Sequence, residues 1–227
     1  MQVGVRARAA GPAGSASCLP KPFGAIALAM SVTHLLYLHG FRSSPQSIKA
    51  RMVQAAVSAR HPLVQWWCPS LPPSPQEAMA LVRSGTAHWS HERMAVVGSS
   101  LGGFYATCAA GERGCRAVVL NPAVHPSRDL ARHMGEHGGW HDPSQRFTFT
   151  QTHVAELRAL EQASHHALRA PEPPHLAVIA KGDEVLDWRE MTARYPHATL
   201  RLLEGGDHAI TDFSDHLEAV LGFLDLV

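Results

Sequence analysis

Residues 94–110 read MAVVGSSLGGFYATCAA, and this stretch decides the fold class. An apolar run leads into two serines, two glycines and an alanine-rich segment, the pattern of a buried strand, a tight turn and a helix. The G-x-S-x-G arrangement fits in one register, in which Gly98 and Gly102 flank Ser100. Ser100 is therefore predicted at the tip of a strand-to-helix turn, where the helix N-terminus favours negative charge. Ser99 is predicted to pack or hydrogen bond beneath that turn.

Strand and helix patterns alternate along the chain. Short apolar runs predict strands at residues 34–40, 63–69, 93–98, 115–122, 175–180 and 199–204. Periodicity and capping residues predict helices at residues 44–60, 74–88, 101–111, 151–168, 187–194 and 212–225, the first with Ser44 as its N-cap. This alternation indicates an α/β fold, a mostly parallel sheet with helices on both faces. Residues 122–150 lack a clear period and are predicted to form a short lid-like insertion.

Composition narrows the class of protein. The chain has 227 residues, 45% of them hydrophobic and 17% charged, which is typical of a globular domain with a full core. Twenty Lys and Arg against nineteen Asp and Glu give a net charge of +1 without a basic block, which argues against nucleic acid as a partner. No apolar run approaches the roughly 18–20 residues that span a membrane. Nothing in the sequence indicates an oligomeric state.

The cysteines indicate a compartment. Cys18, Cys68, Cys108 and Cys115 form no C-x-x-C pair and are too few for a disulfide scaffold. A reducing cytoplasm suits them best.

The N-terminal segment differs from the remainder. Residues 1–30 are rich in Gly, Ala and Pro without a period, so they are predicted to be a disordered extension of a domain that covers residues 31–227. Arg6 and Arg8 ahead of an apolar AIALA faintly resemble a secretory signal, but prolines interrupt that segment. A translation start at Met30 is a further alternative.

A cluster of histidines raises the question of a metal. His133, His137 and His141 recur at helical spacing. Gly138 and Gly139 break any helix there, and no Cys or carboxylate completes a recognisable site. The stretch is interpreted as a solvated loop, and neither a metal nor a cofactor is predicted.

Two residues late in the chain have the chemistry that a serine nucleophile needs. A hydroxyl requires a base, and the base requires an orienting acid. In sheets of this type the acid and then the histidine follow the serine, each just after a strand. Asp183 follows the apolar run at 175–180, and His208 follows the run at 199–204 through a glycine turn.

The acid and the oxyanion hole leave choices open. Asp187 is an alternative acid to Asp183, although its position suits a helix N-cap, and Glu184 is expected to point to solvent. An oxyanion hole needs two backbone N–H groups. Leu101, directly after the serine, and Phe41, in the loop after the first strand, are the predicted donors. His39 in that loop is predicted to be a structural hydrogen-bonding residue.

Four motifs together resemble a known family. YLHGFRSSPQSIKA at 37–50, VVGSSLGGFYAT at 96–107, LNPAVHP at 120–126 and KGDEVLDWRE at 181–190 are similar to the small bacterial YqiA/YcfP-like esterases of the α/β-hydrolase superfamily. The resemblance runs from about residue 33 to the C-terminus. It implies a cofactor-free Ser–Asp–His triad for ester or thioester hydrolysis, carried here by Ser100, Asp183 and His208.

Three functions are compatible with these residues. The leading hypothesis is a cytoplasmic serine hydrolase that cleaves short acyl esters or thioesters through an acyl-enzyme intermediate. Transfer of the acyl group to an alcohol or thiol instead of water is a second. A catalytically silent binding protein on the same fold is a third, because fold does not dictate function.

Overall fold

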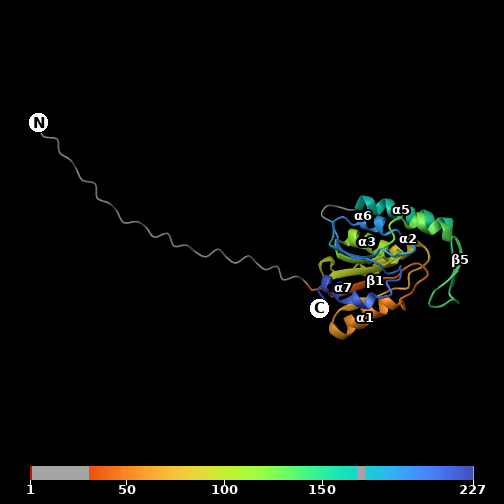
Figure 1. Cartoon of the computed structure of the whole chain (residues 1–227), viewed down its shortest axis with the longest axis horizontal. Coiled ribbons are helices and arrows are strands. Elements are labelled where there is room, and N and C mark those ends of the chain that lie inside the picture. The colour runs from red at the N-terminus through yellow and green to blue at the C-terminus, as the bar shows by residue number, and fades with distance from the viewer. Residues whose placement is uncertain (2–30, 168–171, 227) are drawn as a thin grey trace.

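The computed structural model describes Met1, residues 31–167 and residues 172–226 (Figure 1). Six strands form one sheet in the order β2-β1-β3-β4-β7-β8, and all neighbouring strands in it are parallel. The strands are β1 His34–Leu38, β2 Gln65–Trp67, β3 Met94–Ser99, β4 Arg116–Leu120, β7 His175–Ala180 and β8 Thr199–Leu203. The predicted parallel sheet is therefore confirmed. The prediction for residues 1–30 lies outside the described residues, Met1 excepted.

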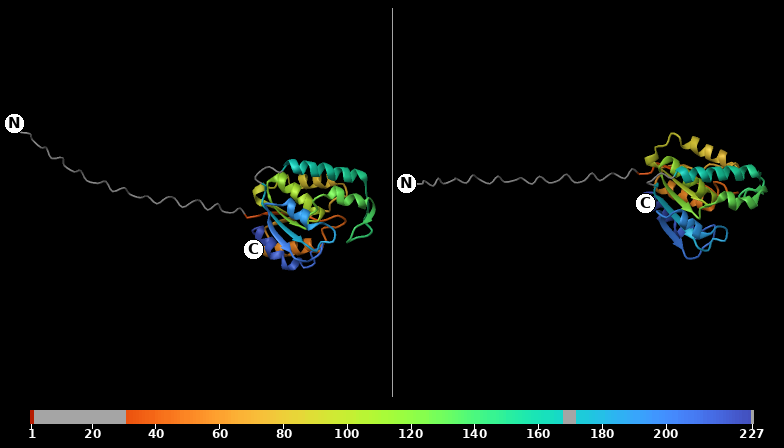
Figure 2. Two further views of the ribbon diagram at one scale, coloured as in Figure 1. Left: turned by 45° about the horizontal axis from the view of Figure 1, so that its top comes forward. Right: turned by 90° about the horizontal axis from the view of Figure 1, so that it is seen from above.

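Helices cover both faces of this sheet (Figures 1 and 2). They are α1 Ile48–Arg60, α2 Pro75–Thr86, α3 Leu101–Arg113, α4 Pro126–Leu130, α5 Gln151–Ala167, α6 Trp188–Arg194 and α7 Leu217–Phe223, together with 3-10 turns η1 His91–Arg93, η2 Ala131–His133 and η3 Phe213–Asp215. Helices α1 and α7 pack on one face, and α2, α3, α5 and α6 pack on the other.

Each face of the sheet has its own hydrophobic core, because successive side chains of a strand point to opposite faces. In β1, Leu36 and Leu38 belong to the core beneath α3, whereas Leu35 and Tyr37 belong to the core beneath α1. All four side chains are fully buried. A continuous apolar run of this kind is what a strand covered on both faces requires.

Two helices begin later than their sequence patterns predict, and one of them is α7, which starts at Leu217 after η3 rather than at residue 212. Helix α2 starts as expected, with Ser74 as the N-cap and Pro75 in its first turn. Helix α1 instead begins at Ile48 with Ser47 as its N-cap, so the prediction of Ser44 was wrong. The cause is a turn ahead of the helix: Ser44 Oγ accepts a hydrogen bond from the backbone N–H of Gln46, and its carbonyl accepts one from Ser47.

The predicted insertion contains more regular structure than its sequence suggests. After α4, an antiparallel hairpin forms from β5 Gly135–Gly138 and β6 Arg146–Phe149, with His137 opposite Phe147. The hairpin projects at the edge of the domain (Figure 1). Each of its strands has only four residues, and β5 begins and ends with glycine. No alternating apolar pattern therefore marks the hairpin in the sequence.

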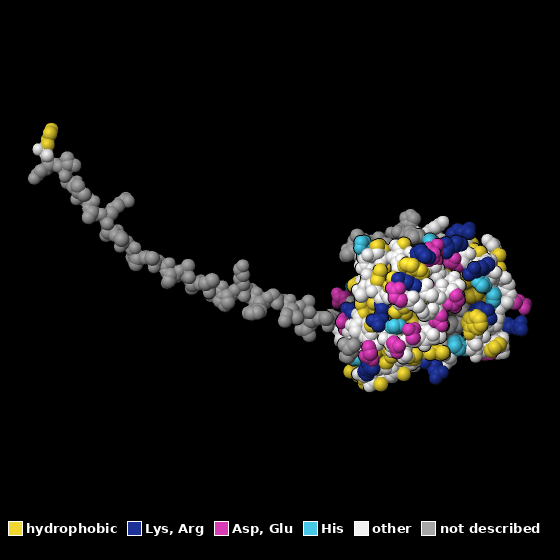
Figure 3. Space-filling model, viewed as in Figure 1, with side chains coloured by type: hydrophobic (Ala, Val, Ile, Leu, Met, Phe, Trp, Pro, Cys, Tyr) yellow, Lys and Arg dark blue, Asp and Glu magenta, His cyan; other side chains and the backbone are white. Residues whose placement is uncertain are grey.

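The surface is of mixed charge. On the face in Figure 3, acidic and basic side chains are interspersed among polar and apolar ones. No helix within residues 31–167 or 172–226 has the length and hydropathy to cross a membrane.

Candidate active site

Ser100 lies at the junction of β3 and α3, as the sequence predicts. Its backbone has φ 56° and ψ −123°, a conformation that non-glycine residues rarely adopt. The glycines around it allow close packing: a Cβ on Gly98 would overlap the carbonyl of Gly102, and one on Gly102 would overlap the carbonyl of Leu38. Ser99 is buried beside the turn. The sharp turn therefore exposes the Ser100 hydroxyl at the carboxyl end of the sheet.

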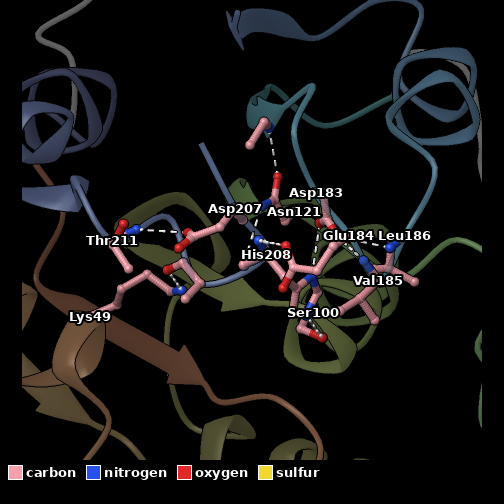
Figure 4. A network of polar contacts seen from close by, with 12 residues as sticks. Lys49, Ser100, Asn121, Asp183, Glu184, Val185, Leu186, Asp207, His208 and Thr211 are labelled. Atoms are coloured by element: carbon pink, nitrogen blue, oxygen red, sulfur yellow. Dashed lines mark hydrogen bonds and ion pairs between the residues drawn. The ribbon is translucent and has the colours of Figure 1, made fainter. Parts of the chain in front are cut away.

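The structure brings Ser100, His208 and Asp183 together in one chain of hydrogen bonds (Figure 4). His208 Nε2 lies 2.9 Å from Ser100 Oγ, and His208 Nδ1 lies 2.8 Å from Asp183 Oδ2. The three residues come from the loops after β3, β8 and β7. The side chain of Asp183 is 0% exposed and that of His208 is 22% exposed, so of these two only His208 borders the solvent.

Asp183, Glu184 and Asp187 each form different hydrogen bonds. Asp183 Oδ1 accepts hydrogen bonds of 2.8 Å from the backbone N–H groups of Val185 and Leu186. Asp187 caps α6, where it accepts a hydrogen bond from Arg189 N–H. Glu184 is exposed, as predicted, and its Oε2 also accepts a 3.0 Å hydrogen bond from the backbone N–H of His208.

Two backbone amides next to Ser100 are available to a ligand. They belong to Leu101 and Phe41, the residues proposed from the sequence as oxyanion donors. Neither amide donates a hydrogen bond within the described part of the chain. Leu101 opens α3, where N-terminal N–H groups have no partner inside the helix.

His39 helps to hold the Phe41 loop. The ring is buried, which lowers its pKa. His39 Nε2 accepts a hydrogen bond from the backbone N–H of Leu71, and Nδ1 lies 3.1 Å from the carbonyl of Gly40. A neutral ring with its proton on Nδ1 satisfies both contacts. The geometry is that of a structural residue that links two loops.

Two pockets share Gly40 and Phe41 as wall residues. The first, which we term the Leu71 pocket, measures about 260 Å³. Its walls include Leu71, Leu101, Tyr105 and Phe147. The second, the Lys49 pocket, measures about 220 Å³ and contains Ser100 and His208 together with Lys49, Ser43 and Trp140.

The hairpin forms part of both pockets and is fastened to the Phe41 loop. Arg42 Nε donates a 3.0 Å hydrogen bond to the carbonyl of Gly138, and Trp140 N–H donates one of 2.8 Å to the carbonyl of Arg42. The guanidinium also stacks 4.1 Å from the centre of the Trp140 ring. The sequence did not reveal this contact, because residues 42 and 140 belong to distant segments.

The histidines of the insertion pack around Phe41. The rings of His133 and His137 lie 6.3 Å and 5.3 Å from the Phe41 ring, measured between centroids. In the described ranges, no group of three His, Cys, Asp or Glu side chains is arranged to hold a metal ion. These two histidines therefore contribute to the wall behind the Phe41 loop.

Lys49 is a site residue that sequence reasoning missed. Its ammonium donates a hydrogen bond to the carbonyl of Ala209, next to His208, and faces Asp207 and Asp183. Burial lowers its pKa to about 8, an effect that the two carboxylates oppose. Position 49 lies on α1, and no local signal connects it with a loop about 160 residues later.

A parallel sheet with helices on both faces, and with serine, acid and histidine on the loops after β3, β7 and β8, defines an α/β-hydrolase fold. The sequence profile of the uncharacterised protein family UPF0227 matches residues 34–225. The chain belongs to this family, which is the YqiA/YcfP-like family that its motifs resemble.

Solved structures support the same fold. One, from the LipS and LipT pair of metagenome-derived lipolytic enzymes, has a TM-score of 0.65 and 21% identity over 86% of this chain and 95% of that chain. Est1E from Butyrivibrio proteoclasticus has a TM-score of 0.61 and 16% identity, covering 86% of each chain. The Pyrococcus furiosus esterase Pf2001 has a TM-score of 0.61 and 15% identity, covering 86% of this chain and 81% of that chain.

Proposed function

We propose that this protein is a serine hydrolase that cleaves short-chain carboxylic esters or thioesters through an acyl-enzyme intermediate. The observation that carries the proposal is the hydrogen-bonded chain from Ser100 through His208 to Asp183, at 2.9 Å and 2.8 Å. Two free backbone amides lie beside the serine. Nucleophile, base, orienting acid and oxyanion donors are the groups that acyl transfer requires.

In the first half of the proposed reaction, Ser100 Oγ attacks the acyl carbon while His208 Nε2 takes its proton. Asp183 holds the imidazole in the orientation that directs Nε2 at the serine and stabilises the imidazolium that forms. The amides of Phe41 and Leu101 donate hydrogen bonds to the oxyanion. His208 then gives its proton to the leaving oxygen or sulfur, and the bond to the acyl carbon breaks.

In the second half, water releases the acyl group. His208 accepts a proton from the water as its oxygen attacks the acyl-enzyme, and returns that proton to Ser100 Oγ as the acid departs. His208 ends the cycle in the protonation state in which it began, so the proposed reaction needs no cofactor.

The positions of the two pockets orient the substrate. His208 must reach the leaving group, so the alcohol or thiol occupies the Lys49 pocket, which contains His208. The acyl chain then enters the Leu71 pocket, next to Leu101. At about 260 Å³, that pocket lies below the usual 300–1,000 Å³ of drug-sized sites, which supports a short acyl group.

Similar proteins support this proposal. LipS and LipT are described as lipolytic enzymes and Pf2001 as an esterase, and Est1E has been solved with ferulic acid bound.

The experiment that tests the proposal combines turnover with covalent labelling. Purified protein should hydrolyse p-nitrophenyl acetate and butyrate faster than the octanoate ester, and an acetyl thioester should be tested beside them. A fluorophosphonate should inactivate the protein with a single adduct, mapped by mass spectrometry to Ser100. Absence of labelling would favour a catalytically silent binding protein, and an adduct on another residue would contradict the mechanism.

A further inference from the structure

The segment from Leu120, the last residue of β4, to Ala123 forms hydrogen bonds with both the N–H and the carbonyl of Ser100. The Ser100 N–H donates a 3.0 Å hydrogen bond to the Leu120 carbonyl, and the Ser100 carbonyl accepts one of 3.0 Å from Ala123 N–H. Both polar groups of a residue with strained dihedral angles are thus held by one short segment.

Within this segment, the side chain of Asn121 points away from Ser100, towards the segments that contain Asp183 and His208. Its Nδ2 donates to the carbonyls of Asp207 at 2.9 Å and His208 at 3.2 Å. Its Oδ1 accepts a 2.8 Å hydrogen bond from the backbone N–H of Ala180, the last residue of β7 and three positions before Asp183. Figure 4 shows the carboxamide between these groups.

An asparagine is well suited to this position for two reasons. The contacts require a donor and an acceptor on one short planar group, which a carboxamide provides. An aspartate would instead place a second acceptor oxygen against two carbonyls. The backbone of Asn121 has φ 41°, in the left-handed region where asparagine is one of the few tolerated residues.

The environment of Asn121 separates it from substrate. The residue is 0% exposed, and it is absent from the walls of both the Leu71 pocket and the Lys49 pocket. Any influence on the reaction must therefore pass through the groups that it binds. The His208 carbonyl is the most direct of these, since it belongs to the base itself.

We propose that Asn121 is a positioning residue that sets the His208 ring between Ser100 and Asp183 by joining the end of β4 to the loops after β7 and β8. This inference rests on the proposed function and deepens it. Because Asn121 acts through His208, its loss should weaken proton transfer while substrate binding is kept.

The test compares Asn121→Gly and Asn121→Asp with the wild type. Glycine tolerates the positive φ and removes only the side chain, whereas aspartate keeps the shape and removes the donor. Both variants should lower kcat for p-nitrophenyl butyrate by about 10- to 100-fold, the cost of a misplacement near 1 Å, with KM changed less than about threefold. Inactivation by a fluorophosphonate should slow in parallel.

A spectroscopic measurement distinguishes positioning from a general structural role. In wild-type protein the proton between His208 Nδ1 and Asp183 should give a low-field proton resonance, assigned by its absence in Asp183→Asn. In Asn121→Gly it should shift or broaden. The control is Thr107→Val, which removes a buried 2.8 Å contact with Tyr195 away from the site. That control should lower the melting temperature while kcat and the resonance stay unchanged.

The outcomes separate the two proposals. Folded Asn121 variants with wild-type kcat and an unchanged resonance would overturn the positioning role, as would variants that both fail to fold, since the residue would then serve folding. Neither result affects the proposed function. That function fails by itself if wild-type protein and Ser100→Ala hydrolyse the ester equally.

Discussion

Asp183 binds His208 with one carboxylate oxygen and its own loop with the other. Oδ2 lies 2.8 Å from His208 Nδ1, while Oδ1 accepts hydrogen bonds from the amides of Val185 and Leu186. The loop therefore holds the carboxylate in place independently of its contact with His208. This division suits an acid whose task is to orient a base.

Asp183→Asn should consequently lower kcat by about a thousandfold or more, because an amide no longer selects the ring tautomer in which Nε2 accepts the serine proton. Steady-state kinetics and a melting curve measure the effect. Asp187→Ala provides the comparison: it removes the N-cap of α6 and should cost about 1 kcal/mol of stability with most activity retained. The reverse result would move the acid to Asp187.

Ser100→Ala should abolish nearly all ester hydrolysis, with a loss of several orders of magnitude in kcat and an unchanged far-UV spectrum. Ser99→Ala should keep most of the activity, since Ser99 forms no part of the hydrogen-bonded chain. If Ser99→Ala were the inactive variant, the assignment of the nucleophile would be wrong.

Phe147→Ala should widen the acyl preference, because the ring forms part of the Leu71 pocket wall and meets Phe41 edge-on at 5.7 Å. We expect kcat/KM for p-nitrophenyl octanoate relative to the acetate to rise by about tenfold, the lower end of what one methylene group contributes in a hydrophobic pocket. Trp140→Ala, in the other pocket, should instead change the dependence on the leaving group. Equal effects of both variants on acyl preference would refute the pocket assignment.

The lowered pKa of Lys49 should make the free energy of unfolding depend on pH in alkaline solution. Burial lowers its pKa from 10.5 to about 8. Between these values the unfolded chain binds a proton that the folded chain does not, so stability from this group increases as pH rises. The difference in unfolding free energy between wild type and Lys49→Met should therefore grow in favour of wild type above pH 8, by about 1.4 kcal/mol per pH unit at most. Urea titrations at pH 7.5 and 9.5 measure it, and a constant difference would contradict it.

Much of the fold was predictable because local patterns specify it. Strands β1, β3, β4 and β7 are mostly buried apolar runs, and the serine turn has glycines where close packing demands them. The positions of Asp183 and His208 follow from the same logic, since the carboxyl ends of parallel strands meet at one edge. The order of the strands along the chain was therefore enough to predict that Ser100, Asp183 and His208 lie at the same edge of the sheet.

The features that sequence reasoning missed depend on contacts between distant segments. Glu184 is exposed as expected, but its hydrogen bond with the backbone N–H of His208, 24 residues later, was not predicted. The direction of Lys49 depends on how α1 packs against the His208 loop. The hairpin is stabilised by Arg42, about 96 residues before Gly138. None of these contacts leaves a periodic signal.

The hairpin is attached to the Phe41 loop, so one part of the site depends on an element that is less stable than the central sheet. Amide hydrogens of β3 and β4, in the buried centre of the sheet, should exchange with solvent only through global unfolding. Those of the two-stranded hairpin should exchange through local opening, since an isolated hairpin is marginal in water. Each opening breaks the contacts of Arg42 and so removes the support that the hairpin gives to the loop with the Phe41 amide. Under the proposed mechanism, the fraction of molecules with a closed hairpin then sets an upper limit on the fraction competent to react.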